Sequence, residues 1–459
     1  MSVQSQADPG RPAISVVIPA YNAAHFLRQC LHHLSTSTAP YECIVVDDGS
    51  KDETAKVAAQ FGAKVLSTEK RSGPAYARNL GARHAQADLL FFIDADVCVT
   101  PNTLARILST FQEDSDLDAM IGSYDDTPER KDFLSQYRNL MHCYTHQRGK
   151  RQACTFWSGC GAIRKNVFLE HSGFNESYGR PAIEDIELGY RLKHSGKQIL
   201  LDPELQVKHL KAWSFTGLVK TDIFDRGIPW TELILRDRNL PNDLNLQLSQ
   251  RVSVALVYVL IALAGAGAIY LGAVFVLPLL ALLFLMLGAY EAESTWRSNP
   301  KAIIGTIGLG LVIVSLAVWS GNHLLVPPVL LAYLLLFVRH RYYYTTVRRR
   351  RATGIFCGLY LALVIVLVLT YLPRHPLVLV FFLVFSIVVI LNSQFYVFLA
   401  GRTGRLLALA AIPFHLLFHF YNGVSFLAGA TLHNLQRFRT DPSAQPEPDK
   451  PHPSPQARP

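Results

Sequence analysis

The chain has 459 residues, of which 50% are hydrophobic and 17% are charged, and its formal net charge is +9. The charged fraction lies below the roughly 25% typical of soluble domains. The charge is also divided unevenly, because residues 251–459 hold 16 Lys/Arg against 5 Asp/Glu (+11), whereas residues 1–250 carry −2. These values exclude a single soluble domain, a disordered chain and a nucleic-acid binder inferred from net charge alone.

Residues 13–240 alternate between strand and helix patterns. Short apolar, β-branched runs are separated by stretches with helical spacing of apolar residues, which predicts an α/β domain with a mainly parallel sheet. The expected strands are residues 13–19, 42–46, 63–67 and 89–93, and the expected helices are residues 22–34, 54–61, 75–84 and 186–194.

Carboxylates follow two of these strands. Asp94 and Asp96 come directly after the run LLFFI, and Asp47 and Asp48 follow the strand at 42–46. Ligands of such sheets bind at the carboxyl ends of the strands, and paired carboxylates there can hold Mg²⁺ or Mn²⁺ together with phosphate oxygens. The alternative for each pair is a turn, and for Asp47-Asp48 also a helix N-cap.

Residues 241–251 are an expected interfacial linker, and residues 252–429 an all-α transmembrane domain of about six to seven helices. Apolar runs of about 20 residues predict membrane spans, and the basic loop RHRYYYTTVRRRR, with six arginines and no acid, predicts a cytoplasmic side. That loop is either a topology anchor or a site for anionic lipid. The expected spans are 252–272, 273–290, 302–320, 324–338, 355–372 and 377–399; residues 406–429 form a seventh span or an interfacial helix.

The two ends of the sequence carry no folding pattern. Residues 1–12 lack an apolar run, which predicts a flexible N-terminus, no cleavable signal peptide and a catalytic half in the cytosol of an inner or plasma membrane protein. Residues 440–459 are rich in Pro, Ser and charge and are expected to be disordered.

Residues 13–240 contain these motif-like blocks in order: IPAYNAAHFLRQCL (18–31), VVDDGSKDET (45–54), SGPAYARNLGA (72–82), FIDADV (92–97), TFWSGCGAIRKNVF (155–168), GFNE (173–176) and IEDIELGYRLKHSG (183–196). Through these blocks, residues 13–240 resemble the inverting family 2 glycosyltransferases of the GT-A fold, a Rossmann-like nucleotide-sugar-binding fold. The resemblance implies transfer of a sugar, in a hexosyltransferase-like reaction, from a nucleotide-diphospho-sugar with the help of Mg²⁺ or Mn²⁺.

On the donor side, the resemblance implies that Pro19 and Tyr21 line the nucleotide pocket. It implies contacts of Asp47 and Asp48 with the base and ribose. It also places Arg78 near the pyrophosphate.

For the donor ribose and the metal, the resemblance implies that Asp94 and Asp96 form the DxD pair that holds both, with Asp94 among the donor-binding residues. His209 would be a metal ligand, and a structural histidine is the alternative.

On the acceptor side, the resemblance assigns Gly159 to the loop that shapes the acceptor pocket. Glu184 and Asp185 match its ED pair, with Asp185 as the general base that takes the acceptor proton. The alternative for this pair is an acidic helix start favoured by the helix dipole.

One block departs from the pattern of processive synthases, which carry Q-x-x-R-W before the membrane. Here Arg226 and Trp230 are spaced differently, and Pro229 is expected to break a helix. Arg226 either contacts the donor pyrophosphate or lies in a plain interfacial stretch. Trp230 is expected on the acceptor side.

The expected function is therefore membrane-bound sugar transfer to a lipid or lipid-linked cell-envelope glycan, in polysaccharide or glycolipid biosynthesis. The expected partners are the donor, the acceptor and the bilayer, without nucleic acid. Two alternatives are a processive polysaccharide synthase-translocase and a non-catalytic membrane transport or scaffold protein with a relict sugar-nucleotide domain.

Overall fold

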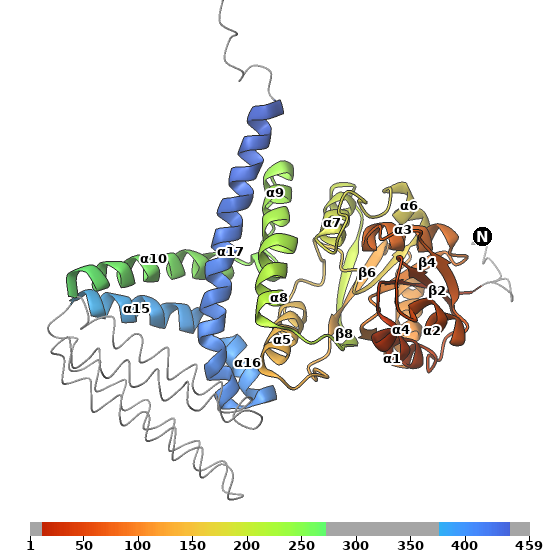
Figure 1. The fold of residues 1–459 in the computed structure, drawn as a ribbon, viewed down its shortest axis with the longest axis horizontal. Coiled ribbons are helices and arrows are strands. Elements are labelled where there is room, and N and C mark those ends of the chain that lie inside the picture. The colour runs from red at the N-terminus through yellow and green to blue at the C-terminus, as the bar shows by residue number, and fades with distance from the viewer. Residues whose placement is uncertain (1–11, 272–375, 441–459) are drawn as a thin grey trace, which may run out of the picture.

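The computed structural model describes residues 12–271 and 376–440 (Figure 1). An α/β domain occupies the N-terminal part of the chain, and a group of long apolar helices lies beside it. The predicted spans at residues 273–290, 302–320, 324–338 and 355–372, the basic loop at 339–353, the flexible N-terminus up to residue 11 and the tail from residue 441 fall outside the described residues.

One eight-stranded sheet organises the α/β domain, in the order β3-β2-β1-β4-β7-β6-β8-β5. Strands β3, β2, β1 and β4 are parallel, as the alternating pattern predicts, whereas β7 runs antiparallel to both β4 and β6. The strands are β1 (Ser15–Ala20), β2 (Glu42–Asp47), β3 (Lys64–Ser67), β4 (Leu89–Ile93), β5 (Val97–Cys98), β6 (Ala119–Tyr124), β7 (Cys160–Arg164) and β8 (Ile199–His209).

Helices cover both faces of this sheet, and each face has its own apolar core. The central strands are buried on both sides, so their sequences are continuous apolar runs. The helices are α1 (Ala24–Leu34), α2 (Thr54–Gln60), α3 (Pro74–His84), α4 (Thr103–Glu113), α5 (Phe133–Gln147), α6 (Lys165–Glu170) and α7 (Glu184–His194). The predicted α/β fold class is confirmed, with a second half of the sheet that is mixed rather than parallel.

A helical run then leads away from the sheet. It consists of α8 (Phe215–Lys220), the π-helix η1 (Thr221–Gly227) and α9 (Ile228–Asp237), without a break between them. The prediction that Pro229 breaks a helix is wrong. Pro229 is the second residue of α9, and the helical run continues through it directly after the π-helix η1.

The expected linker at residues 241–251 contains the 3₁₀ turn η2 (Leu244–Leu246) and the start of α10 (Leu248–Leu271). Further along the chain come α15 (Pro376–Leu391), α16 (Ser393–Thr403) and α17 (Arg405–Thr440). Two described helices are long and apolar enough to cross a membrane, over Leu248–Tyr270 and Leu407–Gln436.

The predicted span at 377–399 is not straight. Residues Val380–Leu391 and Ser393–Thr403 form two helices with a bend of 62° between them, so they are either one broken span or a re-entrant pair. The bend lies at Asn392, whose side-chain amide donates to the hydroxyl of Ser253 on α10 and to the Val388 carbonyl. This buried polar side chain replaces the helical hydrogen bonds that the bend interrupts.

Candidate active site

The predicted carboxylates lie at one edge of the sheet. Asp47 ends β2, and Asp94 directly follows β4, and both strands lie parallel to β1 between them. Their carboxyl ends therefore meet at the same edge, which is where ligands of such sheets bind. The structure thus brings the two sequence motifs together as expected from strand order alone.

Arg78 links the DxD motif to the ED pair. Its guanidinium contacts Asp94 Oδ1 at 2.6 Å and Glu184 Oε1 at 2.9 Å, and the side chains of Arg78 and Glu184 are each only 5% exposed. Burial and the neighbouring Asp96 raise the pKa of Asp94, although the Arg78 charge opposes this. Arg78 Nε is buried without a hydrogen-bond partner among the described residues. Arg78 therefore lies at the site, held by carboxylates.

Asp96 and His209 face each other across the start of β5. His209 Nε2 lies 3.5 Å from Asp96 Oδ2, while His209 Nδ1 lies 2.7 Å from the side-chain oxygen of Asn139. When Nδ1 donates to Asn139, the Nε2 lone pair points at the carboxylate, so a proton or a cation must lie between them. Tyr124 stacks on the His209 ring at 4.4 Å and fixes its plane.

This donor set fits a divalent cation whose shell is only partly made by protein. Among residues 12–271 and 376–440 no cluster of three or more His, Cys, Asp or Glu side chains is placed to hold a metal alone. Asp96 and His209 would supply two ligands, and Mg²⁺ or Mn²⁺ commonly takes the others from phosphate and water.

Asp185 lies in the first turn of α7 and is held firmly. Its Oδ2 accepts hydrogen bonds from Ser158 N–H at 3.0 Å and from the Ser158 hydroxyl at 3.1 Å. The adjoining Gly159 is buried, and a Cβ there would lie 2.8 Å from the Trp157 ring. The loop carrying Gly159 therefore packs directly against the candidate base, and only glycine fits at this position.

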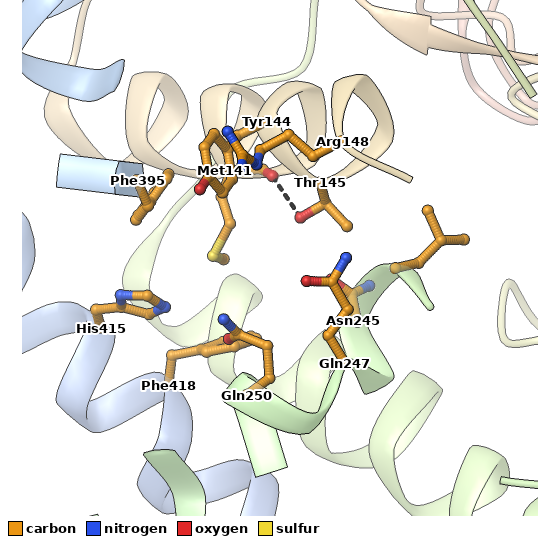
Figure 2. Close-up of a pocket in the computed structure, with 11 residues that line it drawn as sticks. Met141, Tyr144, Thr145, Arg148, Asn245, Gln247, Gln250, Phe395, His415 and Phe418 are labelled. Carbon is orange, nitrogen blue, oxygen red and sulfur yellow. Dashed lines mark hydrogen bonds between the residues drawn. The ribbon is translucent and has the colours of Figure 1, made fainter. Parts of the chain in front are cut away.

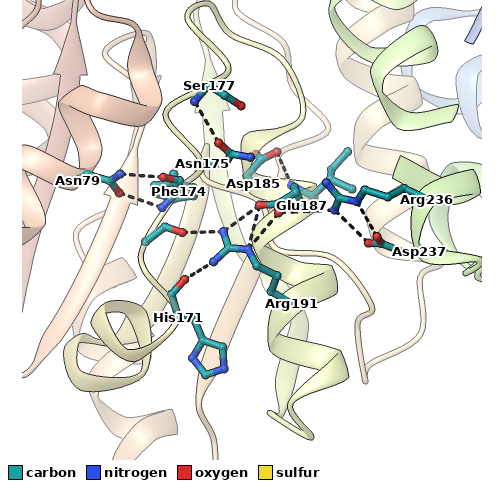
Figure 3. A network of polar contacts seen from close by, with 12 residues as sticks. Asn79, His171, Phe174, Asn175, Ser177, Asp185, Glu187, Arg191, Arg236 and Asp237 are labelled. Carbon is teal, nitrogen blue, oxygen red and sulfur yellow. Dashed lines mark hydrogen bonds and ion pairs between the residues drawn. The ribbon is translucent and has the colours of Figure 1, made fainter. Parts of the chain in front are cut away.

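A second network fixes α7 from the other side (Figure 3). Glu187 pairs with Arg191 at 2.8 Å and lies 3.7 Å from Arg236 of α9. Arg191 also donates to the carbonyls of His171 and Gly173. These contacts tie α7, α9 and the preceding loop into one unit, which holds Asp185 in place.

The nucleotide-side residues divide into two groups. Asp48 is buried, and both of its carboxylate oxygens accept hydrogen bonds, from the Thr68 hydroxyl and from the N–H groups of Ser72 and Gly73. It organises the loop that leads into α3, and its predicted contact with a nucleotide stays a prediction. Tyr21, in contrast, is 37% exposed and lies under the Arg71 guanidinium.

Pro19 and Asp47 lie beside these residues. Pro19 is paired with Val46 in the sheet, and Asp47 accepts from the Ser50 N–H at 3.1 Å. Both are at the strand ends that the nucleotide prediction requires.

Sequence reasoning missed a group of residues on α5. Asn139 orients His209, and His142 and His146 stack on each other at 4.1 Å beside Trp157. Burial lowers the pKa of His146 to about 4, and burial together with nearby positive charge lowers that of His142. Their spacing of four residues on an amphipathic helix was the available signal.

Arg226 and Trp230, the two site residues predicted just before the membrane, have different neighbours in the structure. The Arg226 charge contributes to the pKa shifts of Tyr124, His142 and His146, so it lies near the ring cluster. Trp230 donates from Nε1 to the Tyr190 hydroxyl at 3.2 Å and packs against α7. Its predicted acceptor contact stays a prediction.

A separate small pocket of about 40 Å³ lies where the α/β domain meets the apolar helices (Figure 2). It is bordered by α5, η2, α10, α16 and α17, and its wall combines aromatic and polar side chains, among them Tyr144, Arg148, Gln250, Phe395 and His415. None of the predicted site residues lines it. It marks the junction of the two parts of the chain rather than the carboxylate site.

Comparison with known proteins identifies a family for part of the chain. Residues 15–172 match the profile "Glycosyl transferase family 2". Glycosyltransferase GlyG of Streptococcus pneumoniae is 34% identical over 117 residues, covering 24% of this chain and 38% of that protein. The 4,4'-diaponeurosporenoate glycosyltransferase of Staphylococcus haemolyticus is 36% identical over 135 residues, covering 28% of this chain and 31% of that protein. The matches therefore span well under half the length of these two relatives.

Among solved structures, the mannosyltransferase PcManGT from Pyrobaculum calidifontis, in complex with GDP-Man and Mn²⁺, is 18% identical with a TM-score of 0.39. The match covers 73% of this chain and 88% of that one. A score this low carries no argument about the fold. The comparisons show that residues 15–172 of this chain match glycosyl transferase family 2, in a segment that ends before Glu184, Asp185 and His209.

Proposed function

We propose that this chain is a membrane-bound, inverting glycosyltransferase that moves a sugar from a nucleotide-diphospho-sugar to a lipid or lipid-linked glycan. The observation that carries the proposal is the meeting of Asp94, Arg78, Glu184 and Asp185 at one sheet edge, with Asp96 and His209 beside them. A cation site and an anchored carboxylate base in one place suit this reaction.

On the donor side, the protein groups would compensate negative charge. The diphosphate leaving group gains charge as the bond to the sugar breaks, and preorganised cations stabilise that charge. A divalent cation held by Asp96 and His209 would supply Lewis-acid stabilisation when bound. Arg78 contacts Asp94 and is a protein cation at this position, the Lys211 charge acts on Asp96, and Arg226 is a further cation proposed from the sequence.

On the acceptor side, Asp185 would take the proton of the attacking hydroxyl. Inversion requires one base on the face of the sugar opposite the leaving group, and a single carboxylate suffices for this step. Ser158 and the helix start hold the carboxylate in a fixed orientation. Orientation of this kind is a large part of the contribution of a general base.

The proposed acceptor class rests on the neighbouring apolar helices. The α/β domain leads through η2 into α10, the first candidate span. A catalytic domain attached there at the cytosolic surface of an inner or plasma membrane would meet lipid headgroups directly. One relative acts on 4,4'-diaponeurosporenoate, according to its name.

A processive polysaccharide synthase is the second candidate, because the helical run from α8 to α9 is continuous and Pro229 does not interrupt it. Product length separates the two. Purified full-length protein with one donor and a lipid acceptor is expected to give a product with a single added sugar. A ladder or polymer would instead establish the synthase, and no turnover with any donor would favour the non-catalytic alternative.

A donor screen tests the first step. The full-length protein in detergent is expected to be stabilised against thermal unfolding by one class among UDP-, GDP- and dTDP-sugars in the presence of Mn²⁺. A ligand at 100 times its dissociation constant adds about 2.7 kcal/mol to the unfolding free energy. If no nucleotide sugar raises the melting temperature, the proposal is contradicted.

The metal requirement gives a second prediction. Chelation is expected to abolish donor-dependent stabilisation and transfer, and added Mn²⁺ or Mg²⁺ is expected to restore both. Since imidazole is a poorer ligand for Mg²⁺ than for transition metals, His209→Ala should reduce binding of Mn²⁺ more than that of Mg²⁺. Direct metal titration by calorimetry measures this difference. The matched control is His171→Ala, because the His171 ring contacts the Val167 carbonyl rather than Asp96. Unchanged Mn²⁺ affinity in His209→Ala would exclude His209 as a ligand.

A further inference from the structure

An open groove lies between α5 of the α/β domain and α16 of the bent helix pair, which lie side by side (Figure 1). Its volume is about 420 Å³, and its apolar lining consists of Tyr144 on α5 and of Val397 and Phe398 on α16. The Tyr144 and Phe398 rings pack together with 5.4 Å between their centres. Val397 is 72% exposed, so the described residues leave this apolar wall uncovered. We call this feature the α5–α16 groove.

Polar side chains form one end of the α5–α16 groove, at the level where the first candidate span begins. Arg148 lines both the groove and the small junction pocket, where it lies together with Gln250 (Figure 2). Gln250 is the third residue of α10, and its side-chain amide donates to the side-chain oxygen of Asn392 at 3.2 Å. Asn392 directly precedes Ser393 and Gln394, which also line the groove. Since the span begins two residues before Gln250, this polar end would lie at the height of the lipid headgroups.

The same end carries positive charge without a balancing acid. No Asp or Glu lines the groove or the small pocket beside it. Arg148 is exposed, its guanidinium lies over the Tyr144 ring at 5.4 Å, and it has no ion pair with a described carboxylate. Lys150 and Arg151 are also exposed and also lack such a pair among the described residues. The Lys150 N–H donates to Asp243 Oδ1 at 3.0 Å, which fixes this basic segment to the linker before α10.

We infer that the α5–α16 groove binds one anionic phospholipid, with Arg148 at the lipid phosphate and an acyl chain along Val397 and Phe398. Arginine forms charge-assisted hydrogen bonds with phosphate, and basic residues at the membrane surface attract anionic headgroups. A zwitterionic lipid fits less well, because its ammonium group would face the basic segment. The inference rests on the proposed membrane placement of the apolar helices and not on the proposed sugar transfer.

The test measures lipid affinity of the detergent-solubilised full-length protein by native mass spectrometry, with phosphatidylglycerol and phosphatidylcholine titrated separately. The native protein is expected to bind one phosphatidylglycerol about tenfold more tightly than phosphatidylcholine. Arg148→Gln should reduce this preference to within about twofold, because the charged contact to the phosphate is lost. Val397→Asn should weaken binding of both lipids by about fivefold, because the acyl chain loses an apolar contact.

Two matched controls separate a site from general surface properties. Lys150→Gln removes the same charge two positions from Arg148, but Lys150 does not line the groove, so the preference should stay within about twofold of the native value. Ile390→Asn changes an apolar side chain that is 68% exposed on α15 and lies outside the groove lining. This variant should bind both lipids like the native protein.

Equal affinities of the native protein for the two lipids would overturn the inference. Equal losses in Arg148→Gln and Lys150→Gln would overturn it too, because they would show attraction by surface charge alone. Binding of neither lipid also contradicts it, and a native protein that in addition stays monodisperse without detergent would overturn the proposed membrane placement as well. Absence of sugar transfer, in contrast, would contradict the proposed function and leave the lipid site standing.

Discussion

Replacing Asp185 by Asn is expected to reduce sugar transfer by about 100- to 10,000-fold, the usual contribution of a general base. Asn cannot take a proton from the acceptor hydroxyl, but its side-chain oxygen can still accept both hydrogen bonds from Ser158. The fold and the donor affinity should therefore be kept. Transfer is measured with labelled donor under saturating acceptor, and donor binding by calorimetry on the same preparation.

The matched control is Asp132→Asn. Asp132 is also a carboxylate at a helix start, where it caps α5 by accepting from the Ser135 N–H at 3.0 Å, and Asn caps helices equally well. This variant should transfer sugar at the native rate. If Asp185→Asn also transferred at a rate within threefold of the native one, Asp185 would be an acidic helix start and another group would be the base.

The elements that the sequence predicts best are those set by local patterns. The strands predicted at residues 13–19, 42–46, 63–67 and 89–93 and the helices between them appear with ends shifted by at most two residues. Each is defined by a short apolar run or by helical spacing, which needs no information from distant residues. The shared sheet edge of Asp47 and Asp94 then follows from parallel strands in sequence.

The contacts that complete the site could not be predicted in this way. Arg78 and Glu184 are separated by 106 positions. No local pattern links such residues, and the antiparallel insertion of β7 between β4 and β6 also pairs residues 40 to 75 positions apart. Asn139 carried no signal at all, because an asparagine on a helix is ordinarily a surface residue.

The bend at Asn392 shows the limit of hydropathy. Residues 377–399 are apolar enough for one span, and hydropathy alone predicts a single helix there. The buried amide of Asn392 forms hydrogen bonds to Ser253 of α10 and to the Val388 carbonyl, so polar contacts accompany the bend. A polar pair within an apolar run, here Asn392-Ser393, is the feature that indicates such a break.

Replacing Arg78 by Met is expected to have the largest effect on stability. Arg78 and Glu184 are each 5% exposed, so removal of the guanidinium leaves Glu184 as a buried charge without its partner, and Asp94 loses its contact too. Breaking a buried ion pair from one side costs about 3–5 kcal/mol. Urea unfolding of the full-length protein, followed by tryptophan fluorescence, measures the change in the unfolding free energy of the α/β domain.

Two further variants test whether the unpaired Glu184 charge causes the stability loss in Arg78→Met. Lys56→Met removes one side of an exposed pair, in which Lys56 and Glu53 are 65% and 66% exposed, and should change stability by less than about 1 kcal/mol. Arg78→Met combined with Glu184→Gln removes the uncompensated charge and should recover part of the loss, because residues in direct contact are not additive. A double variant that is less stable than Arg78→Met by the full cost of a second independent change would show that the two side chains do not act as a pair. In that case the Arg78 charge would balance only Asp94 of the DxD motif and not Glu184.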